Sequence, residues 1–278
     1  MKTILLPVEP NSAMAAGFAV ADLVARRFGS HVDGVALKPS IVDFIAPDPV
    51  VVVLPQPQYS ETELTDASRE LFDTFSADRA RTVDASDQTS GRFRWSGRPA
   101  IDDGALAWLS RAYDVTIVGR PGLGRSEPRM TSLESALFES GRPLLMAPPT
   151  SPATIGTNIV IHWNASTEAS RVIHDGMPFL TQAERVTLVS VEGNMSPGLK
   201  AADMIGYFEM HGIKATETHV KPSGRTGAGE ALLAEATRLG ADLLLKGAYT
   251  QSRLRQMIFG GITQHVLQAS NIPVMLSH

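Results

Sequence analysis

Residues 241–276 read ADLLLKGAYTQSRLRQMIFGGITQHVLQASNIPVML. An apolar run at 243–245 stops at Gly247, and a polar, basic loop follows up to the pair Gly260-Gly261. A helix-like segment and a second apolar run complete the pattern of strand, loop, helix and strand. Open α/β sheets build anion sites this way, because glycines let the backbone approach the ligand and the helix offers free N–H groups. The stretch therefore predicts anion or nucleotide binding.

The loop resembles the nucleotide loop of the universal stress protein family. That loop reads Gly-x-x-Gly, nine residues, then Gly followed by Ser or Thr, with another Thr close behind. Gly247 matches the first glycine, Gly260 the third and Thr263 the later threonine. Thr250 stands in place of the second glycine, and Gly261 replaces the Ser or Thr. The resemblance implies that this backbone cradles phosphates, with Thr263 in contact with them.

The other residues of the predicted nucleotide site lie before and within this loop. Asn164 stands where the family typically has an Asp that contacts the adenosine portion, and His162 replaces a proline just before it. Val191 is the closest match to a Val that family members place against the base. Arg253 is expected to meet the phosphates, and Ile262 belongs to the matched loop. The resemblance thus implies ATP or a related adenine nucleotide as a small-molecule ligand.

The order of elements repeats once along the chain. The apolar strand at 3–6 recurs at 158–161, and the strand-ending Gly119 recurs as Gly247. The offset between matching positions shrinks along the chain, which places extra residues in the first half, near 40–60. A repeat of this length indicates a duplicated α/β domain.

Two domains are expected, at 1–150 and 153–278. Each resembles one universal stress protein domain, which implies two tandem doubly wound α/β domains with parallel sheets, of the adenine nucleotide alpha hydrolase-like type. In the first domain the loop keeps Gly119 and Gly122 but has no third glycine at the expected spacing. The first nucleotide loop is therefore expected to be degenerate, and the second to be partly retained.

Composition limits the classes of partner. Hydrophobic residues make up 43% of the chain and charged residues 19%, and the net charge is −4, so neither nucleic acid nor an anionic membrane is expected as a partner. The chain has no cysteine, which excludes disulfides and thiolate chemistry. No apolar run approaches the roughly 18 residues that a membrane helix needs. We therefore expect a cytoplasmic protein.

The resemblance implies a stress-response role without dedicated catalysis. ATP hydrolysis is expected to be weak at most, because no Walker lysine follows the glycine loop and no motif places a general base. The resemblance also implies that the two domains pair through their last strands, at 144–146 and 274–276, and homodimerisation is a further expectation.

Two other hypotheses remain open at this point. The altered loop is also compatible with an interaction protein that binds no nucleotide and meets a protein partner through the Val-rich segment near 40–60. A hydrolase or transferase on the same fold is the third hypothesis, since fold does not fix function. Ser166 and His162 are close in sequence, but Ser166 is better explained as the N-cap of a helix.

Overall fold

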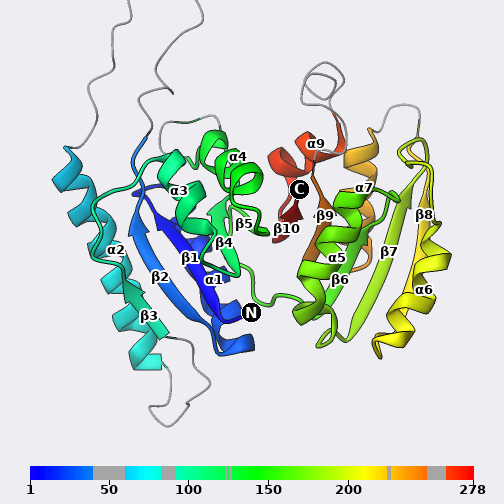
Figure 1. Cartoon of the computed structure of the whole chain (residues 1–278), viewed down its shortest axis with the longest axis horizontal. Helices are drawn as coiled ribbons and strands as arrows, with labels where there is room; N and C mark the ends of the chain where they lie inside the picture. Colours follow the sequence, from blue (N-terminus) through cyan, green and yellow to red (C-terminus); the bar gives the residue numbers. More distant parts are fainter. Residues whose placement is uncertain (40–59, 83–91, 123, 125–126, 224–226, 249–260) are drawn as a thin grey trace, which may run out of the picture. The chain divides into compact units, whose positions relative to one another are not determined.

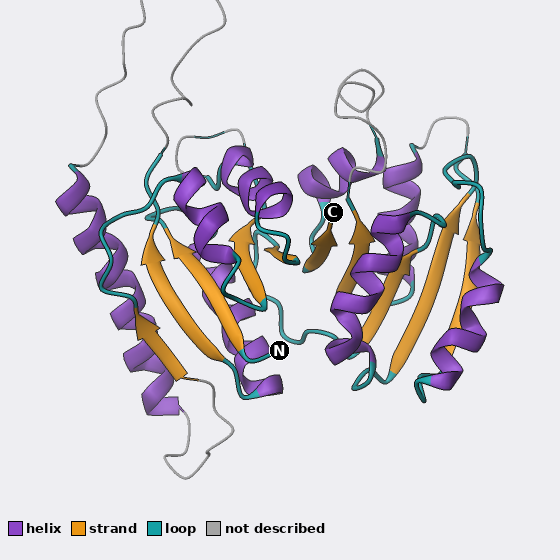
Figure 2. Ribbon diagram, viewed as in Figure 1, coloured by secondary structure: helices purple, strands orange, loops and turns teal. Residues whose placement is uncertain are grey.

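The computed structural model describes residues 1–39, 60–82, 92–122, 124, 127–223, 227–248 and 261–278. The chain forms two compact units. The first contains Met1–Val118 and Gly122–Arg142, and the second contains Gly119–Pro121 and Pro143–His278. Helices cover both faces of the strands in each unit (Figures 1 and 2).

The first unit alternates strands and helices along the chain. Its parallel strands are arranged in the order β3-β2-β1-β4. The elements are β1 (Thr3–Val8), α1 (Met14–Phe28), β2 (His31–Ala36), α2 (Glu61–Thr82), β3 (Arg92–Trp95), α3 (Asp103–Ser110), β4 (Val115–Gly119) and α4 (Met130–Glu139).

Aromatic side chains hold α1 and α2 against the sheet of the first unit. Phe18 of α1 stacks on Phe75 of α2, with ring centroids 4.7 Å apart. Phe72 of α2 lies over Gly34 of β2, where a β-carbon would come within 2.4 Å of the ring. The buried side chains of α2 thus pack on β2 because that strand offers no side chain at this position.

The second unit has the strand order β5-β10-β9-β6-β7-β8. All neighbouring strands are parallel except β5 and β10, which are antiparallel. The elements are β5 (Leu144–Ala147), β6 (Asn158–His162), α5 (Thr167–Leu180), β7 (Arg185–Val191), α6 (Ala201–Met210), β8 (Ala215–Val220), α7 (Ala228–Arg238), β9 (Leu243–Gly247), α9 (Ile262–Ala269) and β10 (Val274–Ser277).

The predicted doubly wound α/β fold is confirmed. Strands β6, β9 and β10 are fully buried runs, as expected of parallel strands covered on both faces. The expected pairing of the last strands is also found, since Leu144 lies opposite Leu276 and Met146 opposite Val274. A domain division at 1–150 and 153–278 stays a prediction from the sequence repeat. None of the helices in the described parts of the chain is long and apolar enough to cross a membrane.

Candidate functional site at the carboxyl edge of the second unit

The predicted site residues in the described part of the chain lie at one edge of the second sheet. His162 ends β6, Val191 ends β7 and Gly247 ends β9. These parallel strands end at the same edge, where open α/β folds bind ligands. Asn164 follows β6 directly, and the first turn of α9 begins at the same edge. The structure therefore brings together segments that are up to about a hundred residues apart in sequence.

The first turn of α9 carries the predicted residues Gly261, Ile262 and Thr263. Gly261 is the N-cap and makes no side-chain hydrogen bond to the helix. The first N–H groups of any helix have no partner inside the helix, and here no cap side chain replaces one. Because the helix dipole places partial positive charge at this end, the turn is suited to an anion.

Gly247 lets β9 approach the start of α5. A β-carbon at Gly247 would lie 2.5 Å from the backbone nitrogen of Ala169 and 2.5 Å from the carbonyl carbon of Glu168. Both atoms belong to helix backbone, which cannot move aside as a flexible side chain can. The matched glycine of the loop is thus required by packing, in addition to any contact with a ligand.

The turn from β6 into α5 is tight and strained. Asn164 is buried, and its side-chain oxygen accepts a hydrogen bond from the Ser166 backbone N–H at 3.3 Å. Ser166 caps α5 by accepting from Ala169 N–H at 3.1 Å, so the N-cap prediction is confirmed. Between them Ala165 has φ of 60°, in the left-handed region that a β-carbon disfavours. The hydrogen bond from the Ser166 N–H holds the side-chain oxygen of Asn164 toward the start of α5.

Ala165→Gly is expected to stabilise the second unit by about 1 kcal/mol, because glycine has no β-carbon to strain the left-handed backbone. The free energy of unfolding in urea measures this gain. Ala202→Gly, on the exposed face of α6, is the control. It is expected to lower the free energy of unfolding by about 1 kcal/mol, the opposite of the change expected for Ala165→Gly. Equal losses in both variants would show that the φ of Ala165 carries no strain.

Lys246 is a residue of this edge that the sequence reasoning did not identify. It stands in β9 between Leu245 and Gly247 and is 3% exposed. Its Nζ donates to the Gly247 carbonyl oxygen at 2.7 Å and to Thr263 Oγ1 at 2.7 Å. Burial lowers the pKa of Lys246 to about 7, against a smaller opposing effect of the Glu168 carboxylate. A lysine inside an apolar strand run, next to the loop glycine, was the available signal.

Three predicted site residues, Thr250, Arg253 and Gly260, lie outside the described residues, as does the Val-rich segment at 40–59. The described site therefore consists of strand ends and the start of α9.

Comparison with known proteins identifies part of this chain. The profile of the universal stress protein family matches residues 208–278, from the end of α6 through β10. The likeness to the universal stress protein family is thus found in residues 208–278. Stress response protein NhaX of Bacillus subtilis (strain 168) is 34% identical over 47 residues, which is 17% of this chain and 28% of NhaX. The match thus spans less than a third of that relative.

Solved structures extend the likeness of fold to the whole chain. A universal stress protein from Archaeoglobus fulgidus DSM 4304 superposes with a TM-score of 0.71 at 13% identity, covering 99% of this chain and 97% of that one. A functionally unknown protein from Pseudomonas aeruginosa PAO1 gives a TM-score of 0.55 at 13% identity, covering 100% of this chain and 92% of its own. These likenesses show a shared fold.

In the first unit, charged side chains gather at the edge where the parallel strands end. Arg129, the N-cap of α4, pairs with Glu9 after β1 and with Asp103 of α3 at 3.1 Å. It also donates to the Lys38 carbonyl oxygen at 3.2 Å, and Ser132 donates to Asp103 at 2.7 Å. Burial raises the pKa of Glu9, and Arg129 opposes that rise. We call Arg129, Glu9 and Asp103 the Arg129 cluster.

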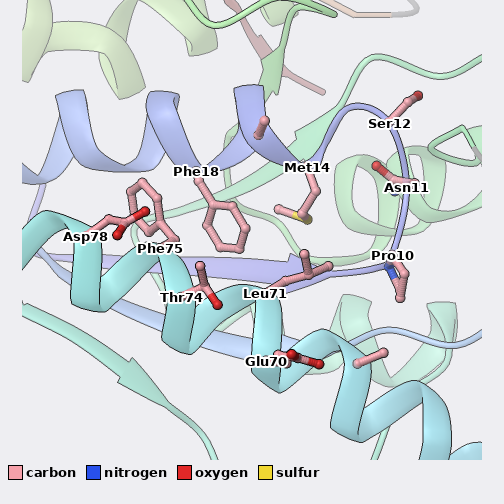
Figure 3. Close-up of a pocket in the computed structure, with 12 residues that line it drawn as sticks. Pro10, Asn11, Ser12, Met14, Phe18, Glu70, Leu71, Thr74, Phe75 and Asp78 are labelled. Atoms are coloured by element: carbon pink, nitrogen blue, oxygen red, sulfur yellow. The ribbon is translucent and has the colours of Figure 1, made fainter.

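A groove of about 620 Å³ lies between α1 and α2 of the first unit (Figure 3). Met14 and Phe18 of α1 line it together with Leu71 and Phe75 of α2. Its lining does not include any member of the Arg129 cluster. The groove also has polar lining residues, including Glu70 and Asp78, and it is separate from the Arg129 cluster.

Proposed function

We propose that the second unit binds ATP or a related adenine nucleotide at its carboxyl edge, and that the protein has a stress-response role without dedicated catalysis. The observation that carries the binding proposal is the uncapped start of α9, with Thr263 in its first turn, beside the ends of β6 and β9. Phosphates fit that helix start. The likeness of residues 208–278 to the universal stress protein family supports the stress-response role.

The adenosine part is assigned to the strand ends. Asn164 offers an amide that can donate and accept hydrogen bonds. Val191, at the end of β7, is assigned to the base, as the family resemblance implies. Thr250, Arg253 and Gly260 remain predicted phosphate contacts from the sequence resemblance. One site per chain is proposed, because the Arg129 cluster fills the equivalent edge of the first unit. A cytoplasmic location and a homodimer remain expectations.

Gly261→Asp tests the phosphate assignment. The backbone of Gly261 has φ of −63°, which any residue adopts, and aspartate is a favourable N-cap, so the variant is expected to fold. Its carboxylate would occupy the anion position and repel phosphate. ATP affinity measured by calorimetry is expected to fall at least about tenfold, the effect of roughly 1.4 kcal/mol. Gly206→Asp, in open space on α6, adds the same charge and should bind as the wild type does.

A direct measurement on the wild type accompanies this variant. The purified protein is denatured, and released small molecules are identified by chromatography and mass spectrometry. An adenine nucleotide near one per chain supports the proposal. If no nucleotide is released and the wild type gives no heat with ATP, the nucleotide proposal fails.

The alternative of a protein partner has one structural observation in its favour. Apolar side chains are exposed on α6 and the segment before it, including Met210 at 88% and Leu199 at 57%. The segment near 40–60, where the sequence placed such a contact, lies largely outside the described residues. This alternative would be favoured if the protein does not bind ATP and if replacing Met210 and Leu199 by polar residues abolishes binding to a protein partner.

A further inference from the structure

Lys246 faces the start of α9 from the sheet. It is the register partner of His162 on the neighbouring parallel strand, so the two side chains leave the sheet on the same face. Gly247, the next residue, points to the opposite face, where a β-carbon would meet α5. The hydrogen bond from Lys246 to Thr263 then places Nζ beside the first turn of α9.

The hydrogen-bond partners of Lys246 carry no charge. Both acceptors, the Gly247 carbonyl oxygen and Thr263 Oγ1, are neutral. Within the described residues no carboxylate lies at ion-pair distance from Nζ. A buried ammonium without a counterion is costly, and the positive end of a helix adds to that cost. The arrangement therefore favours either a neutral amine or a bound anion.

His162 gives a second, independent sign of a ligand. Its side chain is 1% exposed, and Nε2 has no hydrogen-bond partner among the described residues. Buried polar atoms are nearly always satisfied, so an unpaired ring nitrogen beside Lys246 is unusual. Burial first, and the Lys246 charge second, hold the pKa of His162 well below its ordinary value.

The other elements around this pair add little charge. Strand β10 places Leu276 beside Lys246, and His265 of α9 packs against Gly229 of α7. Glu230 of α7 is exposed to solvent. The carboxylate that acts on Lys246 is that of Glu168 at the start of α5. An anion at the start of α9 would thus meet a positive environment.

We propose that Lys246 and His162 bind one phosphate group of the ligand at the start of α9, which makes the second unit a site for phosphorylated ligands in which Lys246 sets the specificity. This proposal rests on the proposed nucleotide function. A protonated lysine has three N–H donors, of which two are used by Gly247 and Thr263. The third has no acceptor among the described residues and can donate to a phosphate oxygen. Adenosine has no phosphate to accept this hydrogen bond, so the donor does not increase the affinity for adenosine.

Binding should be coupled to proton uptake. Because burial lowers the pKa of Lys246 to about 7, the free site is mostly neutral at pH 8, and a phosphate restores the charged form. The ligand therefore takes up close to one proton from solution. As pH rises from 7.5 to 9, the affinity for ATP is expected to fall about 20-fold, since the protonated fraction of the free site falls by that factor.

The test is calorimetry at pH 8 in two buffers of different ionisation enthalpy, with ATP, pyrophosphate and adenosine as probes. Wild type, Lys246→Met and the exposed control Lys214→Met are compared. Wild type and control should take up nearly one proton with ATP and with pyrophosphate. Lys246→Met should lose this uptake and bind both at least about tenfold more weakly, while adenosine binding is unchanged.

The outcomes separate the two proposals. If the wild type binds ATP without taking up a proton, and Lys246→Met binds ATP with the same affinity, the proposed role of Lys246 is wrong. The proposal that the second unit binds a nucleotide would still hold. If pyrophosphate binds with proton uptake and ATP binds no more tightly than pyrophosphate, the phosphate site at Lys246 is supported. The assignment of an adenine nucleotide would then be wrong. No binding of ATP or pyrophosphate overturns both. The wild-type proton count decides the question even where Lys246→Met fails to fold.

Discussion

Arg129→Met is expected to destabilise the first unit by about 3 kcal/mol at pH 7, because it leaves Glu9 and Asp103 buried without their cation. Methionine has a similar length, so packing changes little and the loss reports the charge. Urea unfolding followed by tryptophan fluorescence measures the change, with Arg98→Met as the control at an exposed position. A loss below about 0.5 kcal/mol, the level typical of surface changes, would contradict the prediction.

The loss should depend on pH through Glu9. Its folded pKa already lies above the ordinary 4.5, chiefly because of burial, and removal of Arg129 removes an effect that lowers it. Below pH 4.5 the carboxyl is protonated in both states, so Arg129→Met costs least there. As pH rises, the unfolded chain releases its proton first, and the loss grows. Adding Glu9→Gln to Arg129→Met should restore part of the stability at pH 7.

Lys246→Met is expected to stabilise the second unit at pH 7 and below, by up to about 5 kcal/mol. The folded pKa of Lys246 is about 7 and the unfolded value is 10.5, and each unit of difference is worth about 1.4 kcal/mol. Methionine fills the same space without a charge. The prediction opposes the usual result that changes in a buried strand destabilise.

The pH profile checks the cause of that gain. Between pH 7 and 10.5 the unfolded wild type holds a proton that the folded state lacks, so wild-type stability rises with pH across this window. Lys246→Met lacks the rise, and its advantage should shrink to near zero by about pH 10.5. A constant difference from pH 6 to pH 10 would mean that packing, and not protonation, is responsible. Lys214→Met should follow the wild type throughout.

The Lys246→Met result would show that the proposed phosphate site lowers the stability of the second unit. In the proposed site, a lysine buried at the start of α9 would lower the stability of the fold while it provides a donor for phosphate, as is common at sites that use strained or charged groups. The Arg129 cluster has the opposite character, since its charges are paired within the chain. The first unit therefore has paired charges at the edge where its strands end, whereas the second unit has a buried lysine with neutral hydrogen-bond partners at the same edge.

The sequence predicted the elements whose pattern is strong. The helix at 61–82 forms as Glu61–Thr82, and the fully buried strands appear where continuous apolar runs occur. Pairing of β5 with β10 followed from the family resemblance and is found. The helix and the buried strands depend on burial along a short segment, which the order of residues displays directly.

The side-chain chemistry of the site was harder to predict. Lys246 was hidden within an apolar run, and its importance depends on Thr263, 17 positions later, and on His162 of another strand. The left-handed backbone of Ala165 gives no signal in the sequence, since alanine rarely adopts it. Contacts between distant segments and unusual backbone angles become visible only in the folded chain.

The antiparallel partnership of β5 and β10 has a consequence for biosynthesis. In the second unit β10 lies between β5 and β9, so the interior strand β10 follows all other described strands of this sheet in sequence. Until residues 274–277 emerge, β5 and β9 each present an apolar edge without a partner. The sheet of the second unit can therefore close only after β10 has been made, and its apolar strand edges are open to aggregation until then.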